Sequence, residues 1–90
     1  MAEDDVRVLV VDDVADAAEA LAETLEMSGY KVSVASDGAR ALALIEAEQP
    51  HCVLLDIGMP GMDGNELART LRQRYGDDIV LIAVTGREHD

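Results

Sequence analysis

Four short stretches of the chain carry the hydrophobic patterns of β-strands. Three are apolar runs, interrupted only by Arg7, which are typical of strands buried on both faces of a parallel sheet: Val6–Val11, Cys52–Leu55 and Ile79–Val84. The fourth stretch, Lys31–Ala35, alternates instead, with Val32 and Val34 on one side. We therefore expect it to lie nearer the edge of the sheet.

Segments with helical spacing lie between the first three stretches in chain order, which are Val6–Val11, Lys31–Ala35 and Cys52–Leu55. Four apolar positions fall on one face of a helix that Gly29 can end: Val14, Ala18, Leu21 and Leu25. A second helix is predicted before Pro50, with three apolar positions on its inner face: Ala41, Leu42 and Ile45.

A third helix is predicted after Gly64. Asp63 and Glu66 have the spacing of an acidic N-cap and its reciprocal partner. Leu67 and Leu71 supply the inward face, and Gly76 is the predicted end: the helix therefore links the third and fourth strands.

The order of elements predicts an α/β fold. Strands alternate with helices from residue 6 to residue 84, and the right-handed crossover rule makes this a parallel sheet with helices on both faces. We expect residues 1–90 to form a single domain with an acidic tail at residues 1–5. After Val84 too few residues remain for another strand and helix.

Charge and cysteine content exclude some classes of partner and indicate where the protein works. Nineteen acidic residues against seven basic ones give a formal net charge of −12, which repels phosphate backbones and argues against direct nucleic-acid binding. The single cysteine, Cys52, cannot form an internal disulfide, and neither a signal peptide nor a bilayer-length apolar run is visible. We expect a cytoplasmic protein with no membrane contact.

Oxygen-bearing side chains stand where the predicted strands end. Asp12 and Asp13 follow the first run, Asp56 follows the third, and Thr85 follows the fourth. Carboxyl ends of parallel strands share one edge of the sheet, so neighbouring strands about 4.8 Å apart would bring these carboxylates together. A hard divalent cation such as Mg²⁺ would relieve their repulsion and accept a phosphate as a further ligand.

Three motifs give the chain a family resemblance. VLVVDD at residues 8–13, LLDIGMPGMDG at residues 54–64 and AVTG at residues 83–86 closely resemble a response-regulator receiver domain of two-component signalling. The resemblance spans residues 6–86. It implies a flavodoxin-like, doubly wound parallel sheet of strand order 2-1-3-4, incomplete against the five-stranded family fold, with residues 87–90 as a stub of the next helix.

The resemblance also implies a role for each matching residue. Asp56 resembles the phospho-acceptor, and Asp13 and Asp12 resemble ligands of Mg²⁺ (or Mn²⁺), together with Asp56 and the backbone carbonyl of Gly58. Thr85 resembles the hydroxyl residue that reports the phosphoryl group. The implied donor is a sensor histidine kinase or a histidine phosphotransfer protein, so we expect a signalling domain rather than an enzyme.

One departure from the family pattern is informative. The family's fifth strand carries a lysine that pairs with the phosphoryl group, whereas the only lysine here is Lys31, at the start of the second predicted strand. An alternative function is therefore a receiver-like binding or assembly module without effective phospho-switching. In that case the apolar fourth strand would be an exposed edge through which copies could pair or exchange strands.

Structural explanations compete with each functional one. Asp13 could be only a helix N-cap, Asp12 only a solvated charge, and Thr85 an ordinary strand-end residue. Gly58 could serve backbone conformation alone. A phosphatase with an aspartyl nucleophile fits poorly, because Asp56 lacks the expected aspartate two residues later.

Overall fold

The computed structural model describes residues 6–56 and 64–84. Strands and helices alternate as the sequence predicts, within one residue at each strand end. The elements are β1 (Arg7–Val11), α1 (Ala15–Met27), β2 (Lys31–Ala35), α2 (Gly38–Glu48), β3 (Cys52–Asp56), α3 (Gly64–Tyr75) and β4 (Val80–Val84).

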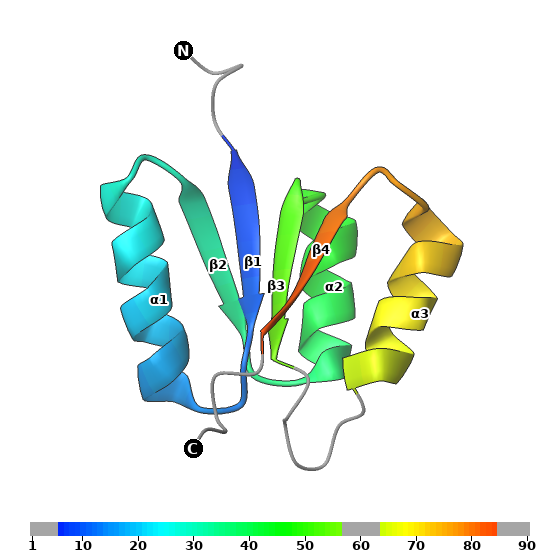
Figure 1. The fold of residues 1–90 in the computed structure, drawn as a ribbon, viewed down its shortest axis with the longest axis horizontal. Helices are drawn as coiled ribbons and strands as arrows, with labels where there is room; N and C mark the ends of the chain where they lie inside the picture. Colours follow the sequence, from blue (N-terminus) through cyan, green and yellow to red (C-terminus); the bar gives the residue numbers. More distant parts are fainter. Residues whose placement is uncertain (1–5, 57–63, 85–90) are drawn as a thin grey trace.

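The four strands form one parallel sheet in the order β2-β1-β3-β4, which confirms the predicted fold class and strand order (Figure 1). β1 lies between β2 and β3, with Val11 in register with both Ala35 and Leu55. All carboxyl ends therefore lie on the lower edge in Figure 1, where open α/β sheets place their ligands.

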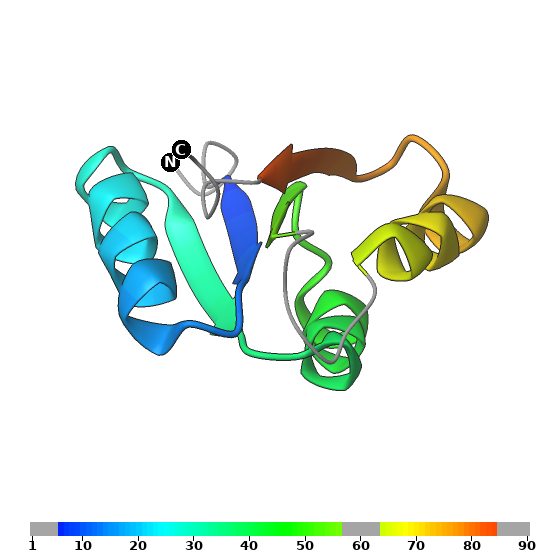
Figure 2. The ribbon, with the colours of Figure 1, turned by 60° about the horizontal axis from the view of Figure 1, so that its bottom comes forward.

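Side chains on the two faces of the sheet build two hydrophobic clusters. On one face, α1 packs through Ala18 against Val8 and Val10. On the other, α2 and α3 pack through Ile45 and Leu71 against a second set of strand residues, and Figure 2 shows this division of the helices. Residues that alternate along β1 thus serve opposite faces, as the continuous apolar run predicts.

The N-terminus of α1 differs from the prediction. Val14 was expected on the inward face, but it is the N-cap residue, with extended backbone angles, and its side chain is 43% exposed. The inward face instead begins at Ala18, and Ala22 is buried as well. Gly29 ends the helix as expected, with φ of +100°, a conformation that favours glycine.

Polar groups hold both ends of α2. At its start, the Asp37 carboxylate accepts a hydrogen bond of 2.7 Å from the backbone N–H of Arg40. At its end, the Arg7 guanidinium donates to the carbonyls of Glu48 and Gln49 at 2.9 and 3.0 Å. The start of β1 is thereby tied to the end of α2, on the edge of the sheet opposite the carboxyl ends.

The two outer strands have different exposed faces. β2 presents Lys31 to solvent. β4 is apolar throughout but leaves Val80 56% and Ile82 45% exposed, so the prediction that this run is buried on both faces is wrong. Asp63, the predicted N-cap of α3, lies outside the described residues. No helix in residues 6–56 and 64–84 is both long and apolar enough to cross a membrane.

Candidate functional site

Three carboxylates meet at the carboxyl edge of the sheet. One oxygen from each of Asp12, Asp13 and Asp56 lies within 4.8 Å of the others. The prediction that neighbouring strands bring these side chains together is therefore confirmed. β1 supplies the first pair through its exit toward α1, and β3 supplies the third directly.

Asp56 occupies the most enclosed position of the three. It is the last residue of β3, a strand that lies between β1 and β4, and it is in register with Val84 of β4. Its side chain is buried, with 6% exposure. Burying a charged side chain costs free energy unless the side chain has partners. The buried position of Asp56 therefore differs from that of a solvated aspartate in a surface turn.

Asp12 is held by the backbone around it. Its N–H donates to the carbonyl of Ala35 at 3.0 Å, which continues the β1–β2 ladder by one residue. Its carboxylate accepts a bond of 3.0 Å from the N–H of Val14. This short-range bond fixes the turn into α1, and a half-buried, hydrogen-bonded Asp12 differs from the alternative of a solvated charge.

Asp13 lies between that turn and the helix. The N-cap position belongs to Val14, whose side chain makes no capping bond, so the alternative of Asp13 as an N-cap alone is wrong. Its side chain is half-buried beside the other two carboxylates. Asp13 is therefore one of the three carboxylates of the cluster.

The donor set suits a hard divalent cation. Three carboxylates within a few ångströms repel one another, and Mg²⁺ or Mn²⁺ prefers such oxygen ligands while keeping positions for water or a phosphate. The described residues therefore fit the metal that the sequence predicts. Gly58, whose carbonyl was predicted as a further ligand, lies outside the described residues, and so does Thr85.

Lys31 stands where the sequence predicts, away from the cluster. It opens β2 in register with Arg7, at the opposite edge of the sheet. Cys52 is also as predicted: it packs against the α1-side cluster, and burial raises the pKa of its thiol. We infer that Cys52 is a structural residue.

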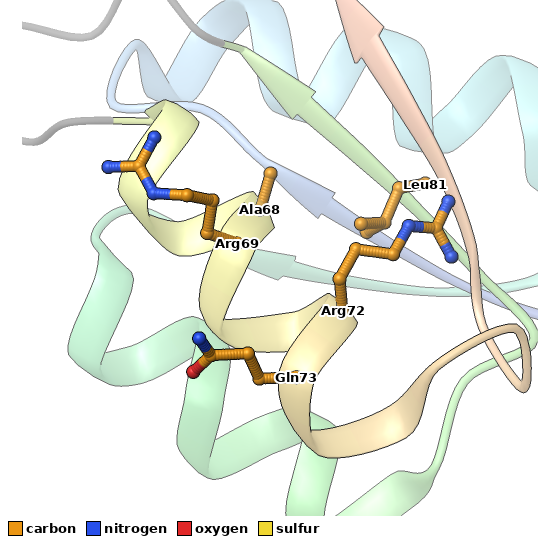
Figure 3. Close-up of a pocket in the computed structure, with 5 residues that line it drawn as sticks. All are labelled: Ala68, Arg69, Arg72, Gln73 and Leu81. Carbon is orange, nitrogen blue, oxygen red and sulfur yellow. The ribbon is translucent and has the colours of Figure 1, made fainter.

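Sequence reasoning did not single out the polar groups that shape the site's surroundings. The bond between the Asp12 carboxylate and the Val14 N–H was missed, although an aspartate that accepts from the N–H two residues later is a known turn signal. Apart from the carboxylate cluster, the arginines of α3, two of which are labelled in Figure 3, were also missed, although three of the chain's seven basic residues lie in the segment Arg69–Arg74.

The chain matches the model of the response regulator receiver domain over residues 8–90. Response regulator MprA from Mycolicibacterium vanbaalenii is 45% identical over 83 residues, covering 92% of this chain and 36% of that protein. The chain thus spans about a third of the length of the curated relatives that it matches.

Solved structures show the same fold. A CheY-like receiver domain protein from Methanospirillum hungatei JF-1 superposes with a TM-score of 0.85 at 33% identity, covering 94% of this chain and 67% of that one. The response regulator TrrA from Thermotoga maritima, in complex with Mg²⁺ and BeF, gives 0.76 at 36% identity, covering 87% and 65%. TrrA in complex with the histidine kinase ThkA gives 0.83 at 37% identity, covering 93% and 72%.

Proposed function

Because the chain belongs to the response regulator receiver domain family, we propose that it accepts a phosphoryl group on Asp56 and signals through the change in shape that follows. One observation carries this proposal. The buried carboxylate of Asp56 lies within 4.8 Å of two further carboxylates at the ligand-binding edge of the sheet.

The chemistry follows from the three side chains. An oxygen of Asp56 forms the new bond to phosphorus, while the bond from phosphorus to the donor's histidine nitrogen breaks and the imidazole leaves with its electron pair. Mg²⁺, or Mn²⁺, held by Asp12, Asp13 and Asp56, would supply positive charge against the anionic donor and the transferring oxygens. Pairing with β4 holds the backbone of Asp56 in place, which favours a fixed position of its carboxylate for attack.

The donor is proposed to be a phosphohistidine on a sensor histidine kinase or a phosphotransfer protein. The complex of TrrA with the kinase ThkA supports this class of partner. Each chain takes one phosphoryl group, so the chain acts as a signalling domain rather than an enzyme. Thr85 remains the predicted residue that reports phosphorylation.

Intact mass spectrometry tests the proposal directly. The chain is incubated with Mg²⁺ and acetyl phosphate, and we expect an adduct of one phosphoryl group that hydroxylamine removes, as it does from an acyl phosphate. Asp56→Asn should abolish the adduct. Asp16→Asn is the matched control, because Asp16 is an exposed carboxylate of α1 outside the cluster, and it should leave the adduct unchanged.

Two results would contradict the assignment. The first is no adduct in the unmodified chain with Mg²⁺ present. The second is an adduct that persists in Asp56→Asn at the level of the Asp16→Asn control.

A second candidate function has its own support in β4. Val80 and Ile82 are exposed on a strand that forms one edge of the described sheet, and such edges can pair with another chain. An assembly module would therefore self-associate through this strand. Light scattering across concentrations checks this, and a constant monomeric mass would rule it out.

A further inference from the structure

The side chain of His51 takes part in the pairing of β1 with β3. His51 directly precedes β3, at the edge of the sheet where the strands begin, which is the upper edge in Figure 1. Its ring Nδ1 accepts a hydrogen bond of 3.0 Å from the backbone N–H of Arg7, the first residue of β1. Its own backbone N–H donates to the Arg7 carbonyl at 2.8 Å. Two bonds thus join the same two residues, and one of them depends on a titratable side chain.

The bond to the ring requires a neutral histidine with one particular tautomer. A backbone N–H can only donate, so Nδ1 must present its lone pair to Arg7, and the single proton of the neutral ring is on Nε2. When Nδ1 takes a proton from solvent, both ring nitrogens become donors. The Arg7 N–H then loses its acceptor. Protonation of His51 and this hydrogen bond therefore exclude each other.

Other bonds of the same two residues connect further elements. The His51 carbonyl accepts from the N–H of Val80, the first residue of β4, at 2.9 Å. The Arg7 guanidinium donates to the carbonyls of Glu48 and Gln49 at the end of α2, at 2.9 and 3.0 Å. The starts of three strands and the end of one helix thus meet at His51 and Arg7.

Charged groups of opposite sign surround the ring. The Arg7 guanidinium of β1 repels a positive ring. Asp78, in the turn between α3 and β4, lines the same cavity of about 280 Å³ as His51, and its carboxylate offers a charged ring an acceptor. At the end of α2, the Glu48 carboxylate accepts from Ser33 of β2 at 2.6 Å. The remaining titratable groups that share a cavity with His51 are phenols and a thiol, which are neutral between about pH 5.5 and 7.5: Tyr30, Cys52 and Tyr75.

We propose that His51 makes the start of the sheet sensitive to pH. The neutral ring holds the first residue of β1 against β3, and protonation at Nδ1 releases it. Histidine is the side chain whose charge ordinarily changes between about pH 5 and 8, so mild acidification is the trigger. Each bond of this junction involves only residues up to Val80, so the proposal does not depend on the chain beyond β4. It is also independent of phosphorylation at Asp56, at the opposite edge of the sheet.

Nuclear magnetic resonance of the full chain tests the proposal at the ring itself. His89→Gln removes the only other histidine, so the remaining ring signals belong to His51. At pH 7.5 we expect the nitrogen signals of a neutral ring with Nδ1 unprotonated and Nε2 protonated. As pH is lowered to 5.5, the amide proton signal of Arg7 should move upfield together with the ring signals, because its hydrogen bond is lost.

Matched variants separate this bond from general effects of acid. His51→Asn keeps an acceptor oxygen, Oδ1, as many bonds from the backbone as Nδ1, but it does not titrate. The Arg7 amide should therefore exchange about two- to tenfold faster in the unmodified chain than in His51→Asn at pH 5.5, the size of one hydrogen bond. At pH 7.5 the two chains should be alike. His51→Ala removes the acceptor, so its Arg7 amide should exchange fast at both pH values.

The amides of Ala18 and Ala22 in α1 are the reference signals, and they should respond to pH equally in every variant. Three outcomes would overturn the proposal. The first is a ring with its proton on Nδ1 at pH 7.5. The second is an Arg7 amide signal that does not follow the titration of the ring. The third is the same acid response of the Arg7 amide in His51→Asn as in the unmodified chain.

Discussion

Each of the three clustered aspartates is placed by a different part of the backbone. Asp56 belongs to a strand, Asp12 extends the β1–β2 ladder and braces the turn, and Asp13 precedes the N-cap of α1. Because three elements set their separation, the cluster depends on the fold rather than on any local motif.

Asp13→Asn should weaken Mg²⁺ binding on the order of tenfold or more, because one charge is lost within a few ångströms of the cation. Isothermal titration calorimetry with Mg²⁺ measures the change. Asp16→Asn serves as the control with the same loss of charge on an exposed face of α1. Equal Mg²⁺ affinity in the two variants would show that Asp13 is not a ligand of the metal.

Cys52 gives a prediction about pH. Burial raises the pKa of its thiol, so the folded chain holds the proton more tightly than the unfolded chain does. Its contribution to stability is complete below the ordinary thiol pKa of about 8.5 and is lost as pH rises through the higher folded value. Urea unfolding from pH 7 upward should therefore show an alkaline loss of stability that is smaller in Cys52→Ala. Identical pH profiles would contradict this.

Of α1 and α2, whose N-caps the structure describes, only α2 has a side-chain cap. Asp37→Ala removes the acceptor for the Arg40 N–H and should lower the free energy of unfolding by about 1 kcal/mol. Urea unfolding followed by circular dichroism measures it. Glu23→Ala, at an exposed position inside α1, should change stability by less than about 0.5 kcal/mol. A cap variant as stable as this control would show that Asp37 contributes nothing.

The sequence predicted the elements well and their ends less well. Apolar runs such as Cys52–Leu55 locate strands, because a strand buried on both faces has few polar residues. Val14 misled the prediction, since its apolar side chain fits the helical spacing but the backbone turns at Asp12 before the helix begins. The hydrogen bond from the Val14 N–H to the Asp12 carboxylate helps to form that turn, and the spacing of apolar residues does not encode it.

The sequence predicts the residues of the candidate site that directly follow a strand. Asp12, Asp13 and Asp56 follow apolar runs whose pairing places them together. The arginines of α3 have no such signal. Arg69, Arg72 and Arg74 look alike in the sequence, and only tertiary contacts show that Glu46 neutralises one while another has no partner among the described residues.

At the scale of the whole molecule, net charge should govern stability. Nineteen acidic residues repel one another most strongly in the compact state, so screening by salt should stabilise the fold. Sodium chloride should raise the melting temperature, and each 1 kcal/mol gained would raise it by about 4–8 °C. Choline chloride should act equally if screening is the cause. A melting temperature that falls with salt would contradict this.

The position of β1 between β2 and β3 also sets an order of events in time. β1 is synthesised first, yet its two neighbours in the sheet come later in the chain, across α1 on one side and across two helices on the other. Non-local pairings of this kind form slowly, so the nascent strand waits for partners while α1 can already pack. We expect pulse-labelling hydrogen exchange during refolding to protect β1 and β2 before β4, and simultaneous protection would refute this order. Of the four described strands, β1 is thus the one that the ribosome exposes longest before both of its neighbours are made.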